Sequence, residues 1–233
     1  YAAKHLFNSS NLKPSDVDGV ILVTQTNDYI IPASACVLHE KLKLSDSCAA
    51  FDVKLGCSGY VYGLWLSYMM VETGSAKNVL LFTGDTVSNL THDKDKTTMP
   101  MFGDGASVTH IRRSEEKTKS FFSMHTDGSG FKNIIVPAGG FREPSSEKTK
   151  IEIQDNDKNL RTPENLYMNG PEVFNFAINV EPKAIKEIIL DAGKTEDDID
   201  HIVFHQANKF FIKRIMSKID IPLAKVPHLM GEK

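Results

Sequence analysis

Short apolar runs and longer amphipathic stretches alternate along the 233-residue chain, separated by polar turns. The short β-rich runs predict strands near Val20, Ala50, Val79, Ala106, Phe121 and Ile202. The longer stretches have apolar residues at a helical period and predict helices over 33–42, 57–73, 171–192 and 208–218. Alternation of this kind is typical of a mostly parallel sheet covered by helices, so the predicted fold class is α/β.

One unit of this pattern occurs twice. Residues 4–22 resemble residues 186–204 at a constant offset of 182, and in both copies an amphipathic helix leads through a polar turn into an apolar strand. The chain therefore reads as two related α/β halves, residues 1–117 and 118–233. The second-half counterpart of Cys57 would fall at 57 + 182 = 239, beyond Lys233, so we expect the second half to be truncated.

Composition and charge exclude several classes of protein. A content of 41% hydrophobic and 24% charged residues is that of an ordinary globular domain. The net charge of -3 supplies no positive field that would attract nucleic acid or an anionic membrane, and the apolar runs are too short to cross a bilayer. Three cysteines without C-x-x-C spacing favour reduced thiols in a cytoplasmic protein, and Cys36 and Cys48 are expected to be buried.

Cys57 is the first candidate for chemistry. It follows the predicted strand around Ala50 and opens an apolar helix that Gly74 can terminate, so it is predicted to lie at a strand-to-helix turn. The amides and positive dipole end of a helix lower a thiol pKa there, and the Cys57 N–H can face an oxyanion. The alternative is a small buried residue with no chemical role.

His205 is the second candidate, because it follows the predicted strand around Ile202 and would lie at the carboxyl end of that strand. Sheets of α/β proteins place their ligands at this end. The repeat maps His205 onto Val23, so one copy of the scaffold carries an ionisable group where the other does not. A single histidine is more often structural, but a Cys/His pair with one member in each half is typical of nucleophilic catalysis.

Five short motifs occur in order along the chain. They are Phe51–Val53 (FDV), Cys57–Tyr60 (CSGY), Phe102–Ala106 (FGDGA), Met168–Phe174 (MNGPEVF) and His205–Asn208 (HQAN). Together they closely resemble the β-ketoacyl-acyl-carrier-protein synthase III family of the thiolase superfamily, over essentially the whole chain. The resemblance implies a thiolase-like αβαβα layered sandwich made of two duplicated halves, of which this chain lacks the first strand and the end of the second half.

The resemblance also implies roles for individual residues. Cys57 matches the nucleophile that takes an acyl group from acyl-CoA, and His205 matches the histidine that assists condensation with malonyl-acyl carrier protein. The third residue of the family's site, an asparagine, matches the region near 239, and Asn208 is a different residue. No metal or redox cofactor is implied.

Binding residues follow from the same resemblance. The family's docking surface for the carrier protein matches Gln206, Ala207, Asn208, Lys209 and Phe210. Positions that line the acyl pocket match Ile31, Phe102, Leu166 and Met168, with Ile31 reaching the pocket of the partner subunit in an expected homodimer. Each of these side chains could equally be plain core or solvated surface.

Two other functions remain open at this stage. The acyl group on Cys57 could pass to an oxygen or nitrogen acceptor without decarboxylation. The chain could instead be a non-catalytic partner subunit, because a fold does not dictate a function. Cys57, His205 and the ordered motifs favour an acyltransferase that forms a carbon–carbon bond, and the presence of Cys57 and His205 argues against a non-catalytic subunit.

Overall fold

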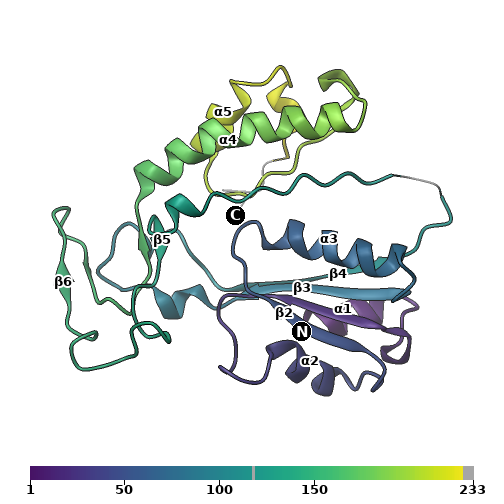
Figure 1. Cartoon of the computed structure of the whole chain (residues 1–233), viewed down its shortest axis with the longest axis horizontal. Coiled ribbons are helices and arrows are strands. Elements are labelled where there is room, and N and C mark those ends of the chain that lie inside the picture. The colour runs from purple at the N-terminus through teal and green to yellow at the C-terminus, as the bar shows by residue number, and fades with distance from the viewer. Residues whose placement is uncertain (117–118, 228–233) are drawn as a thin grey trace. The chain divides into compact units, whose positions relative to one another are not determined.

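The computed structural model describes residues 1–116 and 119–227. The chain divides into two compact units, shown with their elements in Figure 1. Unit 1 comprises Tyr1–Asn89 and Gly103–Thr118, and unit 2 comprises Leu90–Phe102 and Lys119–Lys233. The predicted boundary between 117 and 118 lies outside the described residues, and the duplication into halves stays a prediction. Residues 90–102, part of the predicted first half, group with unit 2.

Unit 1 is built on a four-stranded sheet of order β2-β1-β3-β4. The strands are β1 (Gly19–Val23), β2 (Ala49–Val53), β3 (Asn78–Asp85) and β4 (Gly105–Arg112). β1 pairs in parallel with β2 and β3, and β4 closes the other side of β3 in antiparallel pairing. The strands predicted near Val20, Ala50, Val79 and Ala106 are therefore confirmed.

Helices cover both faces of this sheet (Figure 1). They are α1 (Ala2–Ser9), α2 (Ser34–Leu42) and α3 (Gly59–Glu72). Val20 and Leu80 belong to a core cluster with residues of α1 and α2, whereas Ile21 and Leu81 belong to a second cluster with residues of α3. These four side chains are at most 1% exposed. Burial of each of these side chains stabilises the fold by about 1.5–3 kcal/mol. Because residues on both faces of β1 and β3 are buried, these strands appear in the sequence as continuous apolar runs.

Unit 2 contains two helices, α4 (Gly170–Asp191) and α5 (Lys209–Met216), which confirm the helices predicted over 171–192 and 208–218. Asparagines cap both: Asn169 accepts from the Glu172 N–H at 3.3 Å, and Asn208 accepts from the Phe211 N–H at 2.9 Å. Two short antiparallel strand pairs come before α4 in the chain. They are β5 (Ile134–Ile135) with β8 (Tyr167–Met168) and β6 (Ile153–Gln154) with β7 (Leu160–Arg161).

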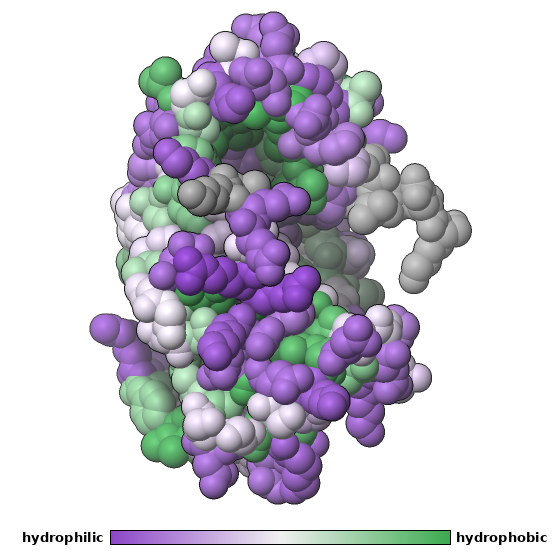
Figure 2. Space-filling view, turned by 90° about the vertical axis from the view of Figure 1, so that its right-hand side faces the viewer, coloured by the Kyte–Doolittle hydropathy of each residue, from purple (hydrophilic) through white to green (hydrophobic). Residues whose placement is uncertain are grey.

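The remaining helical turns are of the 3-10 type. They span Pro14–Asp16, Val87–Leu90, Gly128–Gly130, Glu196–Asp198 and Leu223–Lys225. Within residues 1–116 and 119–227, no helix is both long and apolar enough to cross a membrane. On the face drawn in Figure 2, hydrophilic residues dominate and hydrophobic residues form scattered patches.

The strands predicted near Phe121 and Ile202 are wrong. Neither residues 119–127 nor residues 201–206 are assigned to a strand. The backbone around Ile202 has one hydrogen bond to residue 225, from the Ile202 N–H to the Lys225 carbonyl at 3.0 Å, and Val203 is 78% exposed. A strand requires a ladder of such bonds to a neighbour, which an apolar sequence alone does not supply.

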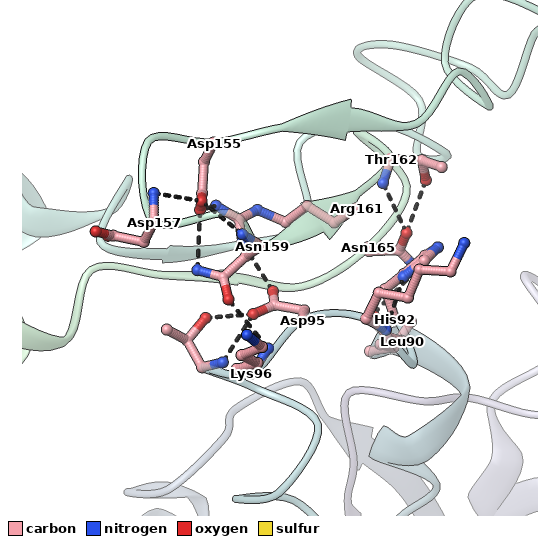
Figure 3. Close-up of polar contacts among 12 residues, drawn as sticks. Leu90, His92, Asp95, Lys96, Asp155, Asp157, Asn159, Arg161, Thr162 and Asn165 are labelled. Carbon is pink, nitrogen blue, oxygen red and sulfur yellow. Dashed lines mark hydrogen bonds and ion pairs between the residues drawn. The ribbon is translucent and has the colours of Figure 1, made fainter.

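A buried ion pair ties three segments of unit 2 together (Figure 3). Arg161 donates to Asp95 at 2.8 Å and to Asp155 at 2.7 Å, and its guanidinium lies 5.0 Å from the ring centre of Tyr167. Asp95 is 1% exposed and also accepts from the Thr97 N–H at 2.9 Å. Burial alone would raise the pKa of Asp95, but the bonds from Thr97 and Arg161 hold it below its usual value.

Candidate active site

The carboxyl ends of three parallel strands meet at one edge of the unit 1 sheet, because β1 pairs in register with β2 and β3. The chain at this edge carries Gln25 after β1, Cys57 after β2 and Asp85 at the end of β3. In the strand order β2-β1-β3-β4, the connection after β1 leads to β2 on one side, whereas the connection after β3 leads to β4 on the other side. Open α/β sheets bind their ligands at such a point.

Cys57 lies in the turn between β2 and α3, and its side chain is exposed. The predicted strand-to-helix position is therefore confirmed, but the helix begins at Gly59, two residues later than predicted. The Gly59 N–H donates to the Gly56 carbonyl at 2.8 Å and closes a tight turn around the cysteine. Cys57 thus lies next to the N-cap Ser58, near the helix end where partial positive charge favours an anion.

Glycines in the first turns of α3 allow this helix to approach the sheet closely. A methyl group at Gly59 would lie 2.3 Å from Val23 Cγ1, and one at Gly63 would lie 2.4 Å from Leu81 Cδ1. Real side-chain carbons do not come this near, so a side chain at either position would force Val23, Leu81 or the helix itself to shift. At the other end of the helix, Gly74 has φ +77 and follows the C-cap, as predicted.

Asp52, on β2, fixes the start of α2 beside this edge. Its carboxylate accepts from the N–H groups of Ser34 and Ala35, both at 2.7 Å, and from Asn27 Nδ2 at 2.6 Å. Two N-terminal amides of α2 are thereby satisfied. Sequence reasoning used Asp52 as part of the FDV motif but assigned it no contact. Its position near the end of a strand is the sequence signal from which this contact could have been predicted.

Asp85 fixes the turn that follows β1, and sequence reasoning missed it entirely. One oxygen, Oδ1, accepts from the N–H groups of Gln25 and Thr26 at 2.7 and 3.0 Å. The same oxygen accepts from the hydroxyls of Thr24 and Thr26 at 3.0 and 2.9 Å. Four donors on one carboxylate oxygen hold the turn to the end of β3.

His205 lies in unit 2, whereas Cys57 lies in unit 1. The His205 side chain is exposed, and its neighbours Ile202 and Phe204 pack against the core cluster formed by α4, α5 and the chain that follows. The His205 carbonyl accepts from the Ala207 N–H at 3.0 Å, which turns the chain toward the cap of α5. The histidine therefore lies just before the N-cap of α5, and the predicted position at the end of a strand is wrong.

Glu181, on α4, is a further titratable group that lies within electrostatic reach of His205. Its burial raises the pKa of the carboxyl, and the charge of His205 opposes that rise. Glu181 precedes Ile185 by one helical turn, and Ile185 packs against the cluster that includes Ile202 and Phe204. Sequence reasoning did not single out Glu181, because nothing along the chain links it to residue 205.

The predicted carrier-protein segment, Gln206–Phe210, runs into α5. Gln206 Nε2 donates to the Phe204 and Pro227 carbonyls at 3.3 and 3.4 Å, whereas its Oε1 is buried without a hydrogen-bond partner among the residues that the structure describes. Ala207 is half-buried and Asn208 is the helix cap. Lys209 and Phe210 are exposed.

The predicted acyl-pocket residues fall in both units. Ile31 is 85% exposed in unit 1, next to a cis peptide bond with Pro32. In unit 2, Phe102 and Met168 are half-buried and Leu166 is buried. Their assignment to a pocket stays a prediction. The expectation that Cys36 is buried is wrong, because this cysteine is exposed on α2, whereas Cys48 is buried as predicted.

Comparison with known proteins gives consistent matches to one family. A family model described as 3-oxoacyl-[acyl-carrier-protein (ACP)] synthase III matches residues 51–130. A β-ketoacyl-[acyl-carrier-protein] synthase III of Caldanaerobacter subterraneus is 38% identical over 226 residues. That match covers 97% of this chain and 65% of the relative, so the chain spans slightly less than two thirds of the length of this curated relative.

Solved structures agree with this match. A crystal structure of 3-oxoacyl-(acyl-carrier-protein) synthase III is 44% identical, with a TM-score of 0.96, over 98% of this chain and 68% of that chain. A 3-oxoacyl-(acyl-carrier protein) synthase from Burkholderia xenovorans LB400 is 37% identical, with a TM-score of 0.85, over 99% of this chain and 64% of that chain. The similarity confirms the predicted thiolase-like α/β fold class.

Proposed function

The chain belongs to the 3-oxoacyl-[acyl-carrier-protein] synthase III family, and on this premise we propose that it is an acyltransferase that condenses an acyl-CoA with malonyl-acyl carrier protein. The product is a 3-oxoacyl-acyl carrier protein for the synthesis of fatty acids or related compounds. The observation that carries the proposal is the position of Cys57. It is an exposed thiol in the strand-to-helix turn at the carboxyl edge of three parallel strands.

The first step is transfer of the acyl group to Cys57. The thiolate attacks the thioester carbonyl of acyl-CoA, the carbonyl oxygen becomes an oxyanion, and the CoA thiolate leaves as the acyl-cysteine forms. Backbone N–H groups around the turn, including that of Cys57, are the donors proposed for the oxyanion. The partial positive charge at the start of α3 favours both the thiolate and the oxyanion.

The second step forms the carbon–carbon bond. Malonyl-acyl carrier protein loses carbon dioxide, the resulting enolate carbon attacks the acyl-cysteine, and the Cys57 thiolate leaves. His205 is the residue proposed to donate to the enolate oxygen. Every bond change in this sequence occurs at the thioesters and the carboxylate of the substrates, so the proposal includes no metal or redox cofactor.

We further propose the surroundings in which the reaction takes place. Gln206–Phe210 is the proposed docking segment for the carrier protein, because Lys209 at the start of α5 and Lys213 and Arg214 in its last turn give this helix positive charge suited to an acidic partner. Ile31, Phe102, Leu166 and Met168 are proposed to line the acyl pocket. A homodimer in the cytoplasm is the proposed state of the enzyme, in which Ile31, exposed in one copy, reaches the other.

Acylation of Cys57 is the direct test. The protein is incubated with a panel of acyl-CoA donors, and intact-mass and peptide-mapping mass spectrometry locate the adduct. We expect the mass of one acyl group on the Cys57 peptide and none in the Cys57→Ala variant. Cys36→Ala is the matched control, because Cys36 is also an exposed cysteine in unit 1 and its removal is expected to leave acylation unchanged.

Addition of malonyl-acyl carrier protein then separates the possible second steps. We expect His205→Ala to form the acyl-cysteine at the rate of the unchanged protein and to lose most of the condensation product. Release of product from acyl-Cys57 without a malonyl donor would indicate transfer to another acceptor and would reject the condensation. Absence of any adduct in a folded protein would reject the acyltransferase altogether.

A further inference from the structure

The turn after β1 and the turn before α3 meet at the edge of the unit 1 sheet. A methyl group built on Gly56 would lie 2.6 Å from Gln25 Oε1, 3.2 Å from its Cδ and 3.5 Å from its Nε2. All three atoms of the amide therefore lie against the backbone of Gly56. Since Gly56 directly precedes Cys57, the Gln25 amide lies beside the peptide group that leads into the nucleophile.

Hydrogen bonds fix the backbone from which the Gln25 side chain extends. Asp85 binds the Gln25 N–H at 2.7 Å and the two threonines on either side of it. The Thr24 N–H donates to the Val53 carbonyl at 3.2 Å, which continues the pairing of β1 with β2. The backbone of residues 24 and 25 is thus fixed to β2 through Thr24 and to β3 through Gln25, although the Gln25 side chain is exposed.

We infer that Gln25 is a positioning residue for Cys57, placed by Asp85 so that its amide packs on Gly56 and fixes the turn that carries the thiol. The inference rests on the proposed function, because it assigns Cys57 the role of nucleophile. A neutral amide suits this place. It fills the space above Gly56 and offers a donor and an acceptor without adding a charge next to the thiolate.

The shift that a charge at residue 25 causes in the pH profile of Cys57 reports how near residue 25 lies to the thiol. Gln25→Glu places a carboxylate of nearly the same shape there, and Gln25→Lys places a cation. Peptide mapping follows the rate of alkylation by iodoacetamide at Cys57 as a function of pH. We expect the midpoint of that profile to rise by about one unit in Gln25→Glu and to fall in Gln25→Lys, because like charge disfavours a thiolate and opposite charge favours it.

Two controls accompany these variants. Cys36 reports within the same molecule, and its alkylation profile is expected to stay unchanged. Gln154→Glu makes the same substitution on β6 in unit 2 and is expected to leave the profile of Cys57 unchanged. Opposite shifts for opposite charges would show that the side chain of residue 25 lies near the Cys57 thiol, which a side chain turned away from Gly56 would not produce. Folded Gln25→Glu and Gln25→Lys variants with the midpoint of the unchanged protein would overturn the inference.

A neutral variant tests positioning itself. Gln25→Ala removes the amide, and we expect the rate constant for acyl transfer to fall about tenfold with an unchanged KM for acyl-CoA, because small misplacements of a reacting group cost rate. If either charged variant does not fold, Gln25→Met takes its place, and we expect the same tenfold fall in the rate constant for acyl transfer as in Gln25→Ala. An unchanged rate constant contradicts the inference. Alkylation needs no acyl-CoA. A shifted profile in a protein that no acyl-CoA acylates would support the placement of Gln25 beside Cys57 and reject the proposed function. An unshifted profile in a protein that is acylated would support the proposed function and reject the placement of Gln25.

Discussion

Removal of the Arg161 guanidinium from the ion pair in unit 2 would leave a carboxylate buried without its cation. Asp95 is 1% exposed, and Arg161→Met removes the cationic donor that lies 2.8 Å from its carboxylate. Breaking a buried pair from one side costs about 3–5 kcal/mol. Asp95 keeps its bonds from Thr97, so we expect the lower end, about 3 kcal/mol of unfolding free energy.

Urea denaturation measures this loss. With a slope near 2 kcal/mol/M, a change of about 3 kcal/mol lowers the midpoint by about 1.5 M. Far-UV circular dichroism follows both units, whereas fluorescence of Trp65, the single tryptophan, follows α3 in unit 1. The two signals together show in which unit the stability is lost.

The control is an exposed ion pair of the same unit. Lys150 lies 3.6 Å from Glu147, with both side chains more than half exposed, so Lys150→Met is expected to cost about 0–1 kcal/mol. Adding Asp95→Asn to Arg161→Met removes the buried charge and is expected to restore part of the loss. The reasoning is refuted if Arg161→Met costs no more than Lys150→Met, or if the second substitution adds a further full loss.

Three further predictions concern single positions. Gly63→Ala forces a methyl group to 2.4 Å from the side chain of Leu81 and is expected to cost about 1–3 kcal/mol, measured by thermal or urea unfolding; an unchanged midpoint would show that α3 can move away. Asp52→Ala leaves the N-terminal amides of α2 without their acceptor and is expected to cost about 1–3 kcal/mol, with faster hydrogen exchange in α2; equal exchange would contradict it. Glu181→Gln is expected to stabilise the protein at neutral pH. Burial raises the pKa of Glu181 in the folded state, so the folded state holds that proton more tightly and the unchanged protein loses stability as pH rises from the unfolded value through the folded one. The difference in Tm between variant and unchanged protein should therefore vanish at pH below about 4, where both states are protonated, and a constant difference across pH would reject this cause.

The parts of the fold that local pattern determines were predictable from the sequence. β1 and the first part of β3 are apolar on both faces, and α4 and α5 have a clear helical period with asparagine caps, so their positions follow from period and end signals. The strands predicted near Phe121 and Ile202 failed for the opposite reason. Each is apolar enough for a strand, but whether a strand forms depends on a partner far away in the chain.

The residues of the candidate site likewise include some that local sequence predicted and some that it did not. Cys57 was found because a strand, two glycines and an apolar helix surround it within a few residues. Asp85 and Gln25 were missed because their contacts join positions about 60 and about 30 residues apart, and the pattern of neither segment reveals the other. Register between parallel strands brings them together, and that register is a property of the sheet.

The division of the chain into units sets the order in which a growing polypeptide can complete them. Residues 90–102 lie between two parts of unit 1, yet they accept long-range backbone hydrogen bonds from residues 160 and 166, from the Leu160 N–H to the Lys94 carbonyl and from the Leu166 N–H to the Leu90 carbonyl. All of unit 1 has been synthesised at residue 118, whereas the partners of this segment follow 42 to 48 residues later. At about 5–20 residues per second, translation takes roughly 2–10 seconds over that interval. During this time we expect residues 90–102 to form a loop on an already folded unit, accessible to proteases and chaperones until their partners leave the ribosome.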